Sequence, residues 1–310
     1  MILVLGGSGF VGGRLLASLQ TIGHDVAYTY ASHITPLAVP GYALDLTRVR
    51  SNDLAELIAR LKPQVVIHSA VMPISGDFIH HHSVSAYSIV RLTQALALHS
   101  PHALIIYLST DCVFGGGRGH YTEQDIPDAR IRRDVYRNYG VCRANGEALL
   151  RDYWPNSIVV RTSVVDGHDV TGELSPRLAA LLAQLQAGVT TKRLVDRFFT
   201  PTLIDNLVSA IAEMSSPTFV YRGIVHVAGR ERISNYEYAR AAARCASMNE
   251  EQIVGEYLAD SSVATLPRDS SLDVGLAQQL LETPMLGVEA QLKAMALPMT
   301  CLIDTKHSFE

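Results

Sequence analysis

Short apolar runs alternate with longer segments whose apolar residues recur every three or four positions along the first half of the chain. A short apolar run bounded by turn residues predicts a buried strand, and a period of about 3.6 residues predicts an amphipathic helix. Strands that alternate with helices in this way are typical of a parallel sheet with crossover connections. We therefore predict an α/β fold.

The same pattern places individual strands and helices. Strands are predicted at residues 2–5, 26–30, 65–68, 104–108, 158–161 and 224–227, with a further strand just before Asp45. Helices are predicted at residues 11–21, 53–61, 85–99, 176–187, 203–214, 235–246 and 288–295, and around Tyr139. A long loop is predicted from residue 115 to about residue 133, and from about Val164 onward the pattern is looser.

A glycine-rich turn joins the first predicted strand to the first predicted helix. Glycines at positions 6, 9 and 12 suit a tight turn, a close approach to a pyrophosphate and close packing of helix on strand. The helix N-terminus would offer free N–H groups and the positive end of its dipole to phosphates. A strand before the glycines and a helix after them are the context that this motif requires. A glycine-rich turn that binds no ligand is therefore the weaker interpretation. We expect these residues to bind a dinucleotide: Gly6, Ser8, Gly9, Phe10, Val11 and Gly12.

The end of the second predicted strand indicates which dinucleotide binds. An acidic residue there would hold the ribose 2′-hydroxyl of NAD, but residues 28–33 contain neither Asp nor Glu. Without that negative charge nothing repels a 2′-phosphate, so NADP(H) is favoured over NAD(H). The chain could bring a positive charge to the phosphate from Arg14, Arg48 or Arg50.

Two other segments are expected beside the cofactor. Asp45 and Leu46 follow a predicted strand, and the Asp45 carboxylate could accept a hydrogen bond from the adenine amino group. Ser69 and Ala70 follow another predicted strand and are expected to line the cofactor cleft. His68, which precedes them, is interpreted as a structural residue.

Tyr139 and Arg143 stand four residues apart in a predicted helix. Residues at i and i+4 share one helix face, so the phenol and the guanidinium can point into one pocket. A neighbouring cation favours the phenolate, which prepares a tyrosine to donate or accept a proton. An exposed Tyr–Arg pair would explain the spacing alone, but the glycine-rich turn favours the chemical interpretation.

Composition and charge argue against several other classes of protein. The 310 residues are 48% hydrophobic and 18% charged, which favours a sizeable core over disorder. A net charge of −4 gives no basic surface for nucleic acid, and no apolar run approaches the length of a membrane span. The chain begins with a strand pattern rather than a secretory leader. We expect a cytoplasmic protein, and we leave a homodimer open.

The cysteines and histidines do not predict a metal site. Cys112, Cys142, Cys245 and Cys301 show neither metal-ligand nor disulfide spacing, so we expect reduced thiols. The run His80–His82 could bind a metal, but adjacent residues seldom converge on one ion. A solvated loop is the favoured interpretation of this run.

Several motifs resemble those of the extended short-chain dehydrogenase/reductase family, and most of all its dTDP-4-dehydrorhamnose reductase branch. The similarity covers nearly the whole chain and keeps the family's order. The motifs are Ser109-Thr110-Asp111-Cys112-Val113-Phe114, Tyr121-Thr122-Glu123-Gln124-Asp125, Tyr139-Gly140, Gly146-Glu147, Arg161-Thr162-Ser163, Phe199-Thr200-Pro201-Thr202, Ser234-Asn235-Tyr236-Glu237 and Arg268-Asp269-Ser270-Ser271-Leu272-Asp273.

The resemblance implies a Rossmann-type doubly wound parallel sheet that binds NADP, with a smaller C-terminal substrate-binding lobe that holds a nucleotide-sugar. The NADP-binding domain would comprise residues 1–163 with about 199–229, and the lobe residues 164–198 and 230–310.

The resemblance also implies roles for individual residues. Hydride would pass from the cofactor to a sugar ketone while Tyr139 protonates the oxygen. Thr110 or Ser109 would hydrogen-bond the carbonyl oxygen, and Arg143 would bind the nicotinamide ribose and lower the pKa of Tyr139. The expected substrate contacts are Val71, Met72, Asp111, Cys112 and Arg197.

The chain departs from the family next to this chemistry. Arg143 occupies the position of the family's lysine, in a chain with four lysines and 22 arginines. Cys112 replaces a usual tyrosine, and Ser85 replaces a usual asparagine. Residues 71–74 replace a polar, acidic substrate loop, and residues 164–167 lack the expected tryptophan and tyrosine.

Three functions therefore stay open. The first is an NAD(P)H-dependent reductase of a nucleotide-activated 4-keto-6-deoxysugar or a related ketone, with Tyr139, Thr110 and Arg143 as its chemistry. The second is a catalytically weak or inactive NADP-binding regulatory subunit, like the regulatory β subunit of methionine adenosyltransferase, a relative in the same branch. The third is a reductase or epimerase of a non-sugar metabolite, which the apolar residues 71–74 suggest.

Overall fold

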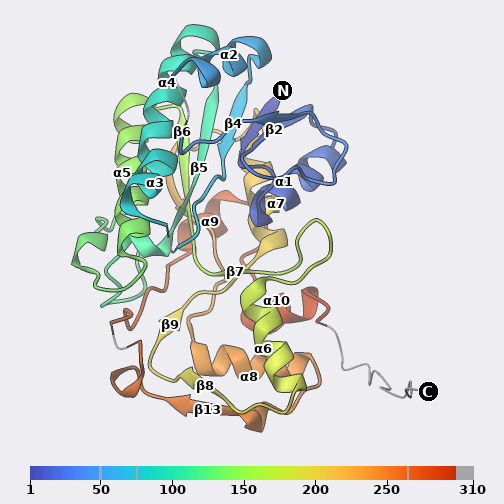
Figure 1. Ribbon diagram of the computed structural model, residues 1–310, viewed down its shortest axis with the longest axis vertical. Coiled ribbons are helices and arrows are strands. Elements are labelled where there is room, and N and C mark those ends of the chain that lie inside the picture. Colours follow the sequence, from blue (N-terminus) through green and yellow to red (C-terminus); the bar gives the residue numbers. More distant parts are fainter. Residues whose placement is uncertain (49–50, 75, 264, 298–310) are drawn as a thin grey trace.

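A seven-stranded parallel sheet with the order β11-β6-β5-β4-β1-β2-β3 forms the centre of the molecule (Figure 1). The computed structural model describes residues 1–48, 51–74, 76–263 and 265–297. The strands are β1 (Ile2–Leu5), β2 (Val26–Tyr30), β3 (Gly41–Ala43), β4 (Val65–His68), β5 (Leu104–Thr110), β6 (Ser157–Thr162) and β11 (Gly223–His226). The strand order reverses between β1 and β4, and in such sheets ligands bind beyond the carboxyl ends of the strands at this point.

Helices cover both faces of this sheet, as Figure 1 shows. α1 (Phe10–Thr21) and α7 (Ile204–Met214) pack together on one face, and α2 (Ser51–Leu61), α4 (Ser88–His99) and α5 (Arg137–Tyr153) pack on the other. Leu15 and Ile211 belong to the core on the first face, and Leu92 and Leu150 to the core on the second. α9 (Gly275–Leu280) lies beside β11. The predicted Rossmann-type doubly wound sheet is confirmed.

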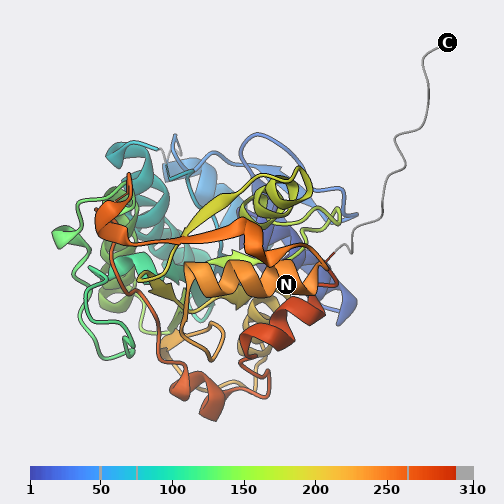
Figure 2. The ribbon, with the colours of Figure 1, turned by 90° about the horizontal axis from the view of Figure 1, so that it is seen from below.

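A smaller lobe lies beyond the carboxyl ends of the strands (Figure 1). Its elements are β7 (Val165–Asp166), α6 (Pro176–Gln186), β8 (Thr191–Leu194), β9 (Phe198–Phe199), β10 (Thr202–Leu203), β12 (Ile233–Ser234), α8 (Asn235–Cys245), β13 (Ile253–Glu256) and α10 (Val288–Ala294). α8 begins with a capping box, in which Ser234 and Glu237 exchange side-chain and main-chain hydrogen bonds. α8 and α10 lie side by side (Figure 2), and Tyr238 and Leu292 belong to the lobe's own apolar core. The division of the chain at residues 163, 199 and 229 stays a prediction.

The largest difference from the predicted elements lies before α4. The sequence pattern starts a helix at about residue 85, whereas α3 (Phe78–His82) and a π-helical turn (Ser83–Tyr87) precede α4 without a break. The Asp77 side chain accepts a hydrogen bond from the main-chain N–H of His80 and so caps α3. The interpretation of His80–His82 as a solvated loop is therefore wrong, because these residues are helical and His81 is buried.

β5 is also longer than predicted, because Ser109 and Thr110 continue its pairing with β6. Within the described ranges, no helix is long and apolar enough to cross a membrane. The same residues form no cluster of three or more His, Cys, Asp or Glu side chains that could hold a metal ion.

Candidate active site

The glycine turn between β1 and α1 has the geometry of a phosphate loop. Gly6 has a φ of +81°, and a Cβ at this position would lie 2.6 Å from the Cα of Ala70. Glycine is therefore required both by the turn and by the close approach of the two chains. The N-cap of α1 is Gly9, so no side chain in this described stretch caps the helix. The first N–H groups of α1, at Phe10, Val11 and Gly12, are thus free to meet an anion.

A pocket of about 190 Å³ opens between the ends of β1, β2 and β4. It brings together most of the predicted cofactor residues, namely Gly6, Ser8, Gly9, Asp45, Leu46, Ser69 and Ala70. Val71 and Met72, which the sequence analysis assigned to the substrate, line this same pocket. Asp45 also caps the following turn, since its Oδ1 accepts hydrogen bonds from the N–H and the hydroxyl of Thr47.

The three arginines proposed for a 2′-phosphate lie in different situations. Arg14 forms an ion pair with Asp205 of α7, so its charge is already partnered. Arg48 is exposed and lies 4.0 Å from the Asp45 carboxylate. Arg50 lies outside the described residues.

Ser32 and His33 are the polar groups at the end of β2. The Ser32 hydroxyl lies 3.1 Å from Nδ1 of His33, and Nε2 of His33 lies 3.0 Å from the main-chain oxygen of Ser8. The ring of His33 thus bridges the end of β2 and the glycine turn. Sequence analysis missed both residues.

Tyr139 and Arg143 meet near the carboxyl ends of β4 and β5. Arg143 is 2% exposed and donates hydrogen bonds to the main-chain oxygens of Leu108 (3.1 Å) and Ala70 (2.6 Å). The guanidinium carbon lies 5.5 Å from the ring centroid of Tyr139 and 5.3 Å from that of Tyr107. No acceptor for Nε of Arg143 is found among the described residues. The predicted common face of α5 is present, and its cation is anchored to Ala70, which lines the pocket of about 190 Å³.

Burial controls the ionisation of Tyr139. Burial raises the pKa of the phenol above its ordinary value, and the charge of Arg143 opposes this shift without reversing it. Arg143 acts to lower the pKa of Tyr139, as the sequence analysis expected, but burial outweighs this effect and the net shift is upward. Tyr139 is therefore held in the protonated form, the form that can donate a proton.

The segment after β5 lies directly against α5. A Cβ at Gly140 would lie 2.1 Å from the main-chain oxygen of Cys112, so the absence of a side chain allows this contact. The hydroxyl of Thr110 donates to Asp111 (3.0 Å) and accepts from the N–H of Cys112. Asp111 is buried and also accepts hydrogen bonds from two other hydroxyls, those of Ser163 and Ser270. Burial raises the pKa of the Cys112 thiol to about 12, so this thiol is not a nucleophile near neutral pH.

Ser109 lies beside Thr110 in the sequence, but its hydroxyl points elsewhere. It donates to the carboxylate of Glu147, which forms a buried ion pair with Arg161 at 2.7 Å. Their side chains are 5% and 1% exposed. Of the two predicted hydroxyls, Ser109 is thus bound within the core, and Thr110 is the one that remains as a partner for a carbonyl.

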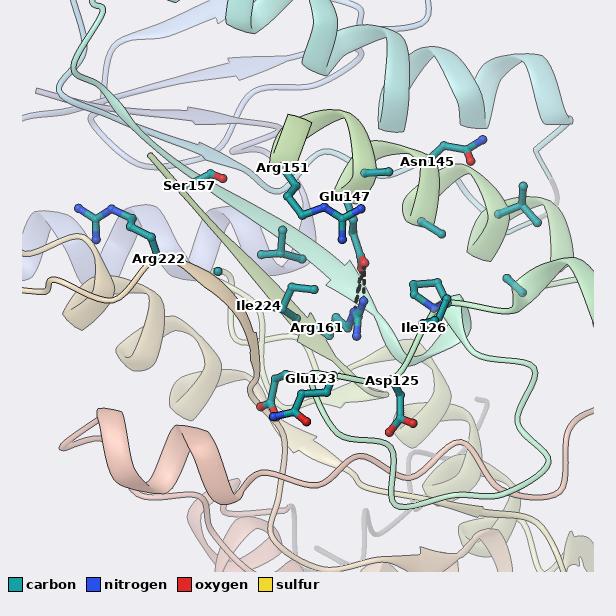
Figure 3. Close-up of a pocket in the computed structure, with 18 of the residues that line it drawn as sticks. Glu123, Asp125, Ile126, Asn145, Glu147, Arg151, Ser157, Arg161, Arg222 and Ile224 are labelled. Carbon is teal, nitrogen blue, oxygen red and sulfur yellow. Dashed lines mark hydrogen bonds and ion pairs between the residues drawn. The ribbon is translucent and has the colours of Figure 1, made fainter. Parts of the chain in front are cut away.

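The Glu147–Arg161 pair also lines a pocket of about 720 Å³ (Figure 3). Ala144, Asn145 and Arg151 of α5 line this pocket, together with residues of β6 and β11. Tyr139 and Arg143 do not line it. Its size alone therefore does not mark it as the reaction site.

A second group of arginines surrounds a pocket of about 380 Å³ in the lobe. Arg177, Lys192, Arg193 and Arg197 are its basic residues. Arg177 is paired with the buried Asp166, whereas within the described residues neither Arg193 nor Arg197 forms an ion pair with a carboxylate. Arg197 donates to Asn235 at 3.0 Å, and Asp111 and Tyr136 are near enough to influence its charge.

His81 lies beside Tyr139, and the sequence analysis gave it no part in the reaction. Its ring centroid lies 5.7 Å from that of Tyr139, with the ring planes tilted by 51°. Asp77, three residues before His80, was the available sequence signal for a helix start that would turn His81 inward. His68 is buried as expected, and its Nε2 lies 2.9 Å from the Ser88 hydroxyl.

Comparison with known proteins identifies the family. The model of the RmlD substrate binding domain matches residues 1–301. The chain belongs to this family. The resemblance to the dTDP-4-dehydrorhamnose reductase branch of the extended short-chain dehydrogenases is thereby confirmed.

Three curated relatives are two reductases and a methionine adenosyltransferase subunit. The probable low-salt glycan biosynthesis reductase Agl14 of Haloferax volcanii is 26% identical over 93% of this chain and 96% of that protein. A dTDP-4-dehydrorhamnose reductase of Aggregatibacter actinomycetemcomitans is 29% identical over 78% of this chain and 83% of that protein. Methionine adenosyltransferase 2 subunit beta of Danio rerio is 26% identical over 78% of this chain and 72% of that protein.

Solved structures agree with this family. A hypothetical dTDP-4-dehydrorhamnose reductase from Sulfolobus tokodaii has a TM-score of 0.76 and 27% identity, and covers 92% of this chain and 96% of its own. The reductase from Bacillus anthracis in complex with NADP has a TM-score of 0.77 at 20% identity, and covers 95% and 97%. The RmlD family and its reductases place the chain among NAD(P)-dependent oxidoreductases of the extended short-chain dehydrogenase type.

Proposed function

We propose that the chain is an NADPH-dependent reductase of a nucleotide-activated 4-keto-6-deoxysugar or a related ketone. The observation that carries the proposal is the pairing of Tyr139 with Arg143 beside the glycine turn. When bound, the nicotinamide cofactor supplies the hydride for the carbonyl carbon. The fit of this cofactor rests on the uncapped start of α1 and on the bare backbone at Gly6.

Tyr139 is the proposed proton donor. Burial keeps its phenol protonated at neutral pH, so it holds the proton that the carbonyl oxygen needs as negative charge develops there. Arg143 lies against the same ring and would stabilise the phenolate that forms when the proton leaves. Arg143 keeps its positive charge whether Tyr139 is a phenol or a phenolate, because the pKa of a guanidinium is too high for it to lose a proton.

Thr110 is the proposed partner of the carbonyl oxygen. Its oxygen already accepts the N–H of Cys112, which fixes the hydroxyl at the end of β5. The hydroxyl proton goes to Asp111 at 3.0 Å, and an incoming carbonyl would compete for it. Asp111 keeps its hydrogen bonds from Ser163 and Ser270 when this happens, so the exchange leaves no buried charge without a partner.

The pocket of about 380 Å³ in the lobe, with its arginines, suits the diphosphate group of a nucleotide-activated substrate. Burial and the neighbouring charge of Arg177 lower the pKa of Arg193, and burial lowers that of Arg197. Arg193 and Arg197 form no ion pair with a carboxylate among the described residues, and cations in this state favour an anion in the pocket that they line. Arg197 also lies near Asp111, so a diphosphate bound here would direct the attached sugar towards Tyr139 and Thr110.

NADPH is the proposed cofactor rather than NADH. The end of β2 carries Ala31, Ser32 and His33, without a carboxylate to hold a 2′-hydroxyl or to repel a 2′-phosphate. Ser32 and His33 line the cofactor pocket with hydrogen-bonding groups that suit phosphate oxygens. A homodimer stays a prediction.

The test is consumption of NADPH, followed at the nicotinamide absorbance, with a panel of nucleotide-activated ketosugars, the corresponding free sugars and simple non-sugar ketones. The proposal expects turnover with at least one nucleotide-activated ketosugar and little with its free sugar. Turnover confined to non-sugar ketones would replace the sugar assignment. NADPH binding without turnover of any substrate would contradict the reductase.

That last outcome would favour the second candidate, an NADP-binding regulatory subunit. Two observations support this alternative: the match to methionine adenosyltransferase 2 subunit beta, and Arg143 in the position of a lysine. Calorimetry with NADPH, and turnover in Arg143→Lys, would separate it from a weak enzyme. Tight binding with no turnover in either protein is the result that the regulatory subunit predicts.

A further inference from the structure

The α3 helix holds His81 against the side of Tyr139. His81 is 1% exposed, although both neighbouring histidines on α3 have more exposed side chains. The thiol of Cys142 donates to the main-chain oxygen of Phe78 at 3.8 Å, which ties the start of α3 to α5. The π-helical turn that follows α3 then redirects the chain into α4. His81 is thus fixed beside Tyr139 by packing on both sides.

One ring nitrogen of His81 lacks a hydrogen-bond partner among the described residues. This nitrogen, Nε2, is buried. A Cβ at Gly76 would lie only 3.2 Å from this nitrogen, so the glycine leaves room next to it. A buried polar atom without a partner costs free energy.

The supply of a proton to Tyr139 after each turnover cannot come from Arg143 or from the neighbouring thiols. A tyrosine that donates a proton in every turnover must regain one before the next. Arg143 cannot supply it, because a guanidinium does not release its proton in a protein. Burial raises the pKa of the thiols of Cys112 and Cys142 to about 12 and about 11, so neither exchanges protons readily near neutral pH.

We propose that His81 returns a proton to Tyr139 between turnovers. The inference rests on the proposed role of Tyr139 as proton donor. The O–H bond of Tyr139 breaks as its proton passes to the alkoxide oxygen of the product. The phenolate then takes the N–H proton of the neutral imidazole, directly or through one water, while the other ring nitrogen takes a proton from a solvent water. The imidazole ends neutral, and one proton has moved from solvent to Tyr139.

The charges around His81 suit this relay. Tyr139 and Arg143 face it from α5, and Asp77 and His80 lie on its own helix and cap. Burial and the charge of Arg143 lower the pKa of His81, so the ring is neutral near neutral pH. A neutral imidazole has one N–H and one free nitrogen, the two groups that a relay requires.

The test compares the first turnover with the steady state in His81→Gln. The first turnover uses the proton already on Tyr139, so its rate should match that of the wild type. Later turnovers need the relay, so kcat should fall by about tenfold or more, with the larger loss at alkaline pH. The KM values for NADPH and ketosugar should not change. His80→Gln, an exposed neighbour on the same helix, is the matched control and should keep the wild-type kcat.

Two further variants protect this test against a folding defect. Added imidazole should restore part of the steady-state rate of His81→Ala. In an Arg143→Lys background His81→Gln should cost little, because an ammonium can exchange a proton where a guanidinium cannot. Equal losses in the first turnover and the steady state, without rescue by imidazole, would make His81 a packing residue and overturn the relay. Loss of all turnover in wild type and variants alike would instead contradict the proposed function.

Discussion

Arg143 lies against the ring of Tyr139, with 5.5 Å between the guanidinium carbon and the ring centroid. Its hydrogen bonds to Ala70 and Leu108 hold it at the ends of two neighbouring strands. The charge therefore stays in one place, between the ring of Tyr139 and the residue Ala70 that lines the pocket at the ends of β1, β2 and β4. The same residue distinguishes this chain from the lysine-containing pattern of its family, and it carries the sharpest predictions.

The pH dependence of the two reaction directions should be opposite. Burial raises the pKa of Tyr139 above its ordinary value, so the proton-donating form prevails at neutral pH and is lost only as pH rises through that raised pKa. Ketone reduction should be nearly flat across neutral pH and decline in strong alkali. Alcohol oxidation, which needs the phenolate, should accelerate over the same alkaline range. Initial rates in both directions, measured with NADPH and NADP, check this. An alkaline loss of reduction that sets in near neutral pH would contradict the raised pKa.

Arg143→Lys should move the alkaline limb of the reduction profile to lower pH. A compact ammonium concentrates its field on the phenol more than a delocalised guanidinium does, so it should lower the pKa of Tyr139 and raise kcat. The variant should also lose about 1–3 kcal/mol of stability, because Ala70 or Leu108 keeps a buried oxygen without its donor. The pH profile and urea unfolding measure the two effects. Arg151→Lys, an exposed change on the same helix, serves as the control.

How much of this site was predictable depends on the range of each interaction. The glycine turn and the Tyr139–Arg143 spacing are local patterns, so the sequence predicted them directly. The turning of Ser109 towards Glu147 depends on the register of β5 against β6, which no local pattern contains. The ion pair between Arg14 and Asp205 joins residues 191 positions apart. Long-range contacts of this kind appear only in the folded chain.

The helix before α4 was missed for a different reason. Three consecutive histidines hide the apolar period that marks a helix face, so residues 80–82 resembled a polar loop. Only the Asp77 cap indicated a helix start, and a single cap is a weak signal. The burial of His81 then follows from the helix and not from the residue type.

Breaking the buried Glu147–Arg161 pair should lower the urea concentration at which the protein unfolds. Arg161→Met leaves a buried carboxylate without its cation, which should cost about 3–5 kcal/mol of the free energy of unfolding. The double variant Glu147→Gln with Arg161→Met should lose clearly less than the two single variants added together. Urea titration of all three proteins measures this. Glu289→Gln, which removes an exposed ion pair with Lys293, is the control and should leave the urea midpoint unchanged. Additive losses would show that the pair does not act as a unit.

Ala31→Asp should reverse the preference for NADPH. A carboxylate at the end of β2 repels a 2′-phosphate and accepts a hydrogen bond from a 2′-hydroxyl. We expect the KM for NADPH to rise by about tenfold or more, with the KM for NADH unchanged or lower. Ala31→Ser adds a polar group of similar size without charge and should keep the wild-type preference. Equal KM values for NADPH in the two variants would contradict the claim that a negative charge at this position repels the 2′-phosphate.

The transfer of hydride by Tyr139→Phe in a single turnover tests the central claim most directly. With enzyme in excess over a nucleotide-activated ketosugar that the wild type reduces, the account predicts that the variant binds NADPH normally. Its rate of NADPH oxidation should be lower by about a hundredfold or more, because the phenol that protonates the carbonyl oxygen is gone. Oxidation of NADPH at the wild-type rate in Tyr139→Phe would contradict the account.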